Sequence, residues 1–132
     1  MKALPIVFLL ASLGTASAAE IDFSAVLKSA DGQAFKSCGE FEYKTSQPIC
    51  IKVEDMTLGA FAAASLNTRS PNMTAQLLVE RGQLAARLYK GGKQALSADE
   101  IKTIKDTFPA TQFPPLEIYA AVQLLDPDSL KK

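Results

Sequence analysis

The hydrophobic pattern of the chain changes near residue 54 from the period of a strand to the period of a helix. Apolar and polar residues alternate over 21–25 and again over 49–53, as they do in half-buried strands. Asp31-Gly32 follows the first stretch and is typical of a hairpin turn, with a positive φ at the glycine. We therefore predict a hairpin that returns over 33–37. The pattern leaves open which arm of this hairpin pairs with 49–53.

The second half of the chain begins with two predicted helices. Thr57 is a suitable N-cap for a helix over 58–66, and a longer amphipathic stripe runs over 74–90. Gly91-Gly92 ends the second helix. Gly82 lies inside that helix, where glycine costs about 1 kcal/mol relative to alanine. We attribute this glycine to the close approach of a neighbouring element.

Two further helices follow, each marked by a local signal at its start. Ser97 and Glu100 have the spacing of a capping box, and the helix they begin ends before Pro109. Pro115 suits the first position of the last helix, which ends before Pro127. The chain thus predicts an α+β fold, with an N-terminal β-hairpin or small antiparallel sheet followed by three to four packed helices.

The N-terminus has the pattern of a secretory signal peptide. Lys2 precedes an apolar run over 3–13, and small residues up to Ala18 provide a cleavage site. The run is shorter than the roughly 20 residues that span a bilayer. We therefore predict a signal peptide over 1–18, cleaved after Ala18, and export to the periplasm or the medium of a bacterium.

Composition indicates one globular domain and excludes several function classes. With 48% hydrophobic and 21% charged residues, we expect a domain over 19–127 and a flexible tail over 128–132. Fourteen basic residues balance fourteen acidic ones, which argues against binding to nucleic acid. No later stretch has the length of a membrane span. The chain has no His, which excludes Ser-His-Asp and Cys-His catalysis and His-ligated zinc.

Cys38 and Cys50 are the only cysteines, so an exported chain can form only one internal disulfide. Closing this loop is worth about 3 kcal/mol by loop entropy. Redox pairs prefer the C-x-x-C spacing, and a metal site needs more ligands than two cysteines. We predict a structural disulfide and no metal or cofactor.

The segment between the cysteines holds the candidate interaction residues, Glu40, Phe41, Tyr43 and Lys44. A constrained loop that exposes these aromatic side chains is one interpretation, because preorganisation lowers the entropy cost of binding a protein partner. The other is a short strand in which Phe41 and Tyr43 point inward. Their alternation with charged residues favours the strand.

Three functions remain open for such a chain. We favour a non-enzymatic binding or interaction module. The acidic pairs Glu40/Glu42 and Glu54/Asp55 allow a carboxylate-dependent hydrolase or lytic factor, which requires one buried carboxyl at a defined distance from a second. A self-assembling structural component is the third function. No residue is assigned as catalytic, and the sequence does not determine an oligomeric state.

Several segments together resemble a group of small proteins encoded in tailed phages and prophages. The resemblance covers most of the chain after the signal peptide and includes the Asp31-Gly32 turn. It implies a shared architecture and no catalytic residues. The signal peptide and the cysteine pair are departures from that group. The segments are TLG (57–59), RGQLAARLYK (81–90), LSADEIKTIK (96–105) and PPLEIYAAVQLLDP (114–127).

Overall fold

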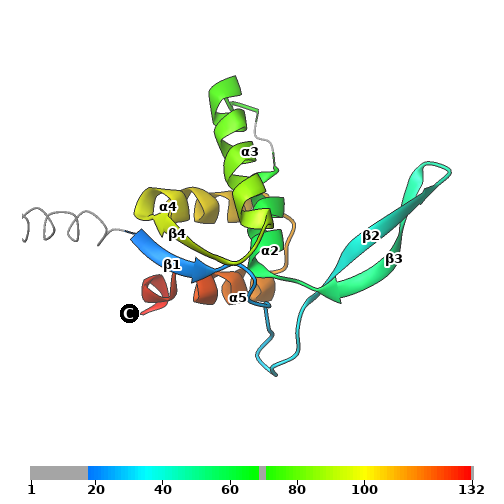
Figure 1. Cartoon of the computed structure of the whole chain (residues 1–132), viewed down its shortest axis with the longest axis horizontal. Helices are drawn as coiled ribbons and strands as arrows, with labels where there is room; N and C mark the ends of the chain where they lie inside the picture. Colours follow the sequence, from blue (N-terminus) through cyan, green and yellow to red (C-terminus); the bar gives the residue numbers. More distant parts are fainter. Residues whose placement is uncertain (1–17, 69–70, 132) are drawn as a thin grey trace, which may run out of the picture.

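The computed structural model describes residues 18–68 and 71–131, and within them the chain has the predicted α+β architecture. Over these two ranges, the fold consists of two small antiparallel sheets and four α-helices (Figure 1). The predicted signal peptide over 1–18 lies outside the described residues, except for Ala18. The elements are β1 (Ala18–Asp22), β2 (Lys36–Lys44), β3 (Gln47–Asp55), α2 (Leu58–Leu66), α3 (Ala75–Tyr89), β4 (Lys93–Ser97), α4 (Ala98–Thr107), α5 (Pro115–Leu125) and the 3-10 turns η1 (Phe108–Ala110) and η2 (Pro127–Leu130).

The first sheet joins two segments that are far apart in the sequence. β1 pairs antiparallel with β4, from Ala18 opposite Ser97 to Asp22 opposite Lys93. Sequence patterns did not indicate β4, because this five-residue strand is inserted between a glycine turn and a helix cap. Gly92, with a φ of 78°, turns the chain from α3 into β4, and its carbonyl accepts a hydrogen bond from the backbone N–H of residue 23.

The predicted turn at Asp31-Gly32 is present, but the strands around it differ from the expectation. Gly32 has a φ of 86°, and an isolated bridge joins Lys28 to Ala34 across the turn. The returning strand is not confined to 33–37. It begins at residue 36 and continues through Cys38 to residue 44 as β2. β2, not the segment before the turn, is the partner of β3.

The helices begin where their caps predict. Thr57, Thr74 and Ser97 each accept a hydrogen bond from a backbone N–H three residues on, at 3.1–3.2 Å. Glu100 completes the capping box, because its Oε1 accepts the backbone N–H of Ser97 at 3.0 Å. The capping signals in the sequence therefore predict the first residues of α2, α3 and α4.

The core lies among the β1–β4 sheet and the helices. Phe61 packs edge-on against Phe108, with ring centroids 5.4 Å apart. Gly59 allows α2 to approach the C-terminal end of α3, because a Cβ there would lie 2.3 Å from the Leu88 carbonyl oxygen. Gly82 faces open space, so the predicted close approach at this residue is wrong. The buried apolar cluster comprises Ile21, Phe23, Leu27, Met56, Leu58, Phe61, Ala62, Leu66, Leu84, Leu88, Leu96, Ile104, Phe108, Ala120, Ala121 and Leu125.

Candidate functional site

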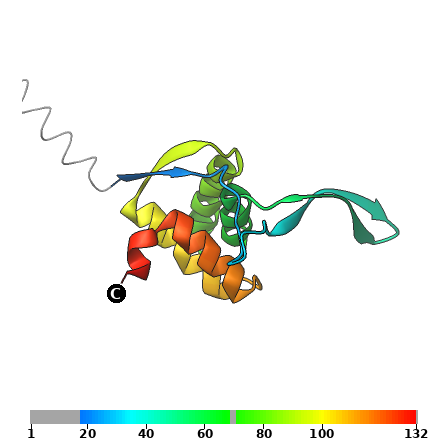
Figure 2. The same cartoon turned by 90° about the horizontal axis from the view of Figure 1, so that it is seen from below.

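Strands β2 and β3 form a two-stranded ribbon that projects from the helical body. Figures 1 and 2 show it extending away from the helices in both views. In the described residues the two strands pair only with each other, and every residue over 39–55 is exposed. A two-stranded hairpin is marginally stable by itself. Because no other described strand pairs with the ribbon, its folded state depends on contacts between its own two strands.

The register of the ribbon contains two compensating bulges. Gly39 lies between the paired residues Cys38 and Glu40 but has no residue opposite it, and Ile51 is likewise unpaired on β3. A Cβ at residue 39 would overlap the side chain of Glu54, so the first bulge suits a glycine. The bulges change the alternation of side chains midway along both strands.

The bulges bring both aromatic residues, both cysteines, Pro48 and Val53 to one face of the ribbon. Directly opposite residues share a face, as do residues two apart on a regular strand. Phe41 therefore shares a face with Cys50, and Tyr43 with Pro48. Since Cys38 is opposite Val53 and bonded to Cys50, these residues belong to the same side. We call this surface the apolar face, and it consists of Cys38, Phe41, Tyr43, Pro48, Cys50 and Val53.

The aromatic residues of the apolar face are open to solvent. Phe41 is 50% exposed, Tyr43 76% and Val53 65%. The predicted strand with its alternating aromatic residues is thus confirmed. The expectation that they point into the protein is wrong, because nothing in the described chain covers this face.

The opposite surface, the charged face, carries Glu40, Glu42, Lys44, Lys52 and Glu54 with Ile49 among them. It has three glutamates and two lysines, and each lysine lies near a glutamate: Lys44 is 3.7 Å from Glu42, and Lys52 is 3.9 Å from Glu54. The structure thus separates the four predicted interaction residues. Phe41 and Tyr43 share the apolar face, whereas Glu40 and Lys44 belong to the charged face.

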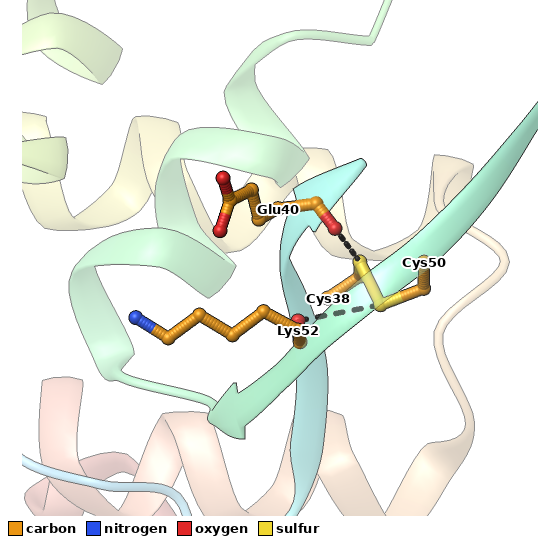
Figure 3. The surroundings of a disulfide bond; sticks show 4 residues. All are labelled: Cys38, Glu40, Cys50 and Lys52. Atoms are coloured by element: carbon orange, nitrogen blue, oxygen red, sulfur yellow. Dashed lines mark hydrogen bonds between the residues drawn. A yellow bond between two sulfur atoms is a disulfide. The ribbon is translucent and has the colours of Figure 1, made fainter. Parts of the chain in front are cut away.

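The predicted disulfide is present near the base of the ribbon. Cys38 and Cys50 are bonded, with their Cα atoms 5.8 Å apart (Figure 3). Their Sγ atoms lie 3.0 and 3.3 Å from the carbonyl oxygens of Glu40 and Lys52. These are S···O contacts, because a disulfide sulfur carries no proton. In Figure 3 the side chains of Glu40 and Lys52 point the same way, away from the disulfide.

The tip of the ribbon is a two-residue turn. Thr45 occupies the left-handed region with a φ of 55°, which is uncommon for a β-branched residue. Among the described residues it is the only non-glycine with a positive φ. The conformation closes the ribbon tightly, so β2 and β3 stay paired to Lys44 and Gln47.

The acidic pairs proposed for hydrolysis lie on this exposed ribbon. Glu54 and Asp55 border a cavity of about 450 Å³ at the ribbon base, but each is paired with a lysine, Asp55 with Lys36. A second cavity, of about 620 Å³, is lined by residues of α3 and α4, among them the Arg87–Glu100 ion pair at 2.7 Å. Glu54 and Asp55 are exposed and each is held in an ion pair, whereas a glycosidase requires one buried carboxyl.

Over 18–68 and 71–131, no three His, Cys, Asp or Glu side chains cluster closely enough to hold a metal ion. Within the same ranges, no helix is both long enough and apolar enough to cross a membrane.

In comparisons with protein-family models, curated proteins and solved structures, nothing matched this chain.

Proposed function

We propose that this chain is a non-enzymatic interaction module that binds a protein partner through the apolar face of its ribbon. The observation that carries the proposal is the exposure of Phe41 and Tyr43 on a disulfide-bonded projection outside the core. Monomeric proteins rarely leave a continuous apolar patch of several hundred Å² open to water. Aromatic side chains held in place before binding are typical anchors of protein interfaces.

The ribbon favours binding through a face over binding through an edge. Both strands carry a bulge, at Gly39 and at Ile51, and bulged edges are poor templates for an added strand. Four of the five charged residues of the opposite face form two ion pairs, so this face provides little attraction for a strongly charged partner. A partner with an uncharged, apolar surface fits this arrangement best.

The proposal includes export to an oxidising compartment. It is supported by the signal-peptide pattern over 1–18 and by the disulfide between Cys38 and Cys50, since disulfides persist outside the reducing cytosol. A phage or prophage origin remains part of the proposal through the sequence resemblance. The genes that flank this one test that origin.

The binding proposal is tested by capture of a partner from a periplasmic extract. Tagged wild-type protein should retain a partner, and Phe41→Ser with Tyr43→Ser should lose it while circular dichroism shows an unchanged helical fold. Ile49→Ser is the matched control, because Ile49 is 49% exposed, like Phe41, but lies on the charged face. Equal capture by all three proteins would contradict the proposal, as would unfolding caused by the two aromatic substitutions.

A further inference from the structure

We propose that the partner of the apolar face is the apolar face of a second copy of this chain, in a twofold dimer whose ribbons stack face to face. This inference rests on the proposed function, since it requires the ribbon to be an interaction surface. In a twofold interface the same patch contacts itself, so one face must supply both sides of the contact. Three properties of the apolar face meet that requirement.

The first property is the distribution of large and small side chains. From tip to base the face carries Tyr43 beside Pro48, then Phe41 beside Cys50, then Cys38 beside Val53. Two ribbons that stack antiparallel about a twofold axis place Tyr43 of each copy over Cys38 and Val53 of the other, with Phe41 and Cys50 of both copies at the centre. Large residues then meet small ones, and aromatic rings meet sulfur, which is a favourable contact.

The second property is charge. No residue of the apolar face is charged, and the nearest ionic groups on that side are Lys36 and Asp55, which pair with each other at the ribbon base. The charged faces of both ribbons remain turned to water in the stacked dimer. Without the predicted signal peptide, which contains Lys2, the chain has 13 basic and 14 acidic residues and a formal net charge of minus one, so long-range repulsion between two copies is small.

The third property is area. An aromatic side chain can bury on the order of 150–250 Å². Phe41 and Tyr43 are 50% and 76% exposed, and Val53 adds to them at 65%. Together with Pro48 and the disulfide, each face offers several hundred Å², so complete burial of both faces removes at most about 1,000 Å² from water. That is the lower limit for a specific protein interface.

The oligomeric state of the full chain provides the first test. Sedimentation over a concentration series should show a monomer–dimer equilibrium for the wild type. Tyr43→Ser and Phe41→Ser should each weaken dimerisation by at least about tenfold. Ile49→Ser should leave it unchanged, and dichroism with intact mass should confirm the fold and the disulfide in every variant. A wild type that stays monomeric throughout the series overturns the inference, as does equal weakening by Ile49→Ser.

Cross-linking tests the arrangement of the ribbons. A photoreactive phenylalanine analogue replaces Tyr43 in a mixture of unlabelled and ¹⁵N-labelled protein. Mixed-isotope products that join residue 43 to the segment around Val53 support the antiparallel stack. Products that join two tips overturn it. If the chain is monomeric and residue 43 cross-links to another protein of the periplasmic extract, the dimer fails while the proposed function stands. If Phe41→Ser affects neither assembly nor capture, both fail.

Discussion

At the scale of single residues, two glycines in neighbouring helices have opposite effects on packing. Gly59 in α2 lies against backbone: an added Cβ would be 2.3 Å from the Leu88 carbonyl oxygen and 3.0 Å from that of Phe23. Gly82 in α3 has nothing within 4 Å of the corresponding position. The close helix contact expected at Gly82 therefore exists in this fold, but at Gly59.

Alanine substitutions should separate these two roles. Gly82→Ala should raise the free energy of unfolding by up to about 1 kcal/mol, because alanine favours the helix and meets no neighbour. Gly59→Ala should lower it by about 1–3 kcal/mol, because backbone atoms cannot move aside without shifting α2 from α3. Urea unfolding followed by circular dichroism measures both. A destabilising Gly82→Ala would show that α3 has a neighbour at that point.

The capping box of α4 predicts a pH dependence. The backbone N–H of Ser97 donates to Glu100 and, together with the hydrogen bond from Arg87, holds the pKa of Glu100 below its ordinary value of 4.5, although partial burial opposes the shift. A carboxyl whose pKa is lower in the folded state stabilises the protein above the pKa of the unfolded state. That contribution is lost as the pH falls through the folded-state pKa.

Glu100→Gln keeps the hydrogen-bond geometry of the capping box but removes the charge. We expect this variant to be less stable than the wild type at neutral pH, by roughly 0.5–1 kcal/mol. The difference should diminish below about pH 4.5 and vanish once Glu100 of the folded wild type is protonated. Thermal unfolding at a series of pH values tests this. A difference that is independent of pH would mean that the charge contributes nothing.

At the scale of elements, the helices could be predicted from the sequence because their signals are local. A cap such as Thr57 or Ser97 acts on N–H groups within the next turn, so one chain segment contains the whole signal. β4 could not be predicted in this way, because its pairing depends on β1, more than seventy residues earlier. Strand pairing of this kind is decided by tertiary contacts.

The same distinction explains the partial success at the candidate site. The spacing of Cys38 and Cys50 and the alternation at Phe41 and Tyr43 were visible in the sequence, and both features are present. Alternation shows that side chains share a face but not what covers that face. The two bulges also place Val53 on the apolar face, which a strict period of two along the strand would not do.

The ribbon should unfold independently of the helices when its disulfide is removed. In the double variant Cys38→Ser, Cys50→Ser, loss of the cross-link should favour opening of the ribbon by about 3 kcal/mol, or on the order of 100-fold. Chymotrypsin cleavage after Phe41 and Tyr43 should accelerate accordingly. The thermal transition of the helices should change little, because the ribbon residues lie outside the buried cluster. A matching loss of helical stability would show instead that the ribbon supports the core.

At the scale of the whole molecule, the described chain has two parts: a body, formed by the helices and the β1–β4 sheet, and the exposed ribbon of β2 and β3. The body holds the buried apolar cluster, and the ribbon holds Cys38, Cys50 and the exposed aromatic residues. Substitutions of the exposed aromatic residues therefore leave the buried apolar cluster intact. The stability of the ribbon also depends on the redox environment, because its disulfide persists in an oxidising compartment and is reduced in the cytosol.

The export prediction links the N-terminus to this chemistry. Protein recovered from the periplasm should have the mass of residues 19–132 with both cysteines oxidised, and Ala18→Lys should block cleavage and accumulate the precursor. Cleavage after Ala18 removes the β1 position opposite Ser97 but leaves the pairs from Ala19 to Asp22, so the β1–β4 sheet should persist. Mass spectrometry before and after thiol alkylation measures both the start point and the disulfide. Uncleaved, fully reduced protein confined to the cytoplasm would contradict export, and the ribbon would then present its aromatic residues without the cross-link that holds them in place.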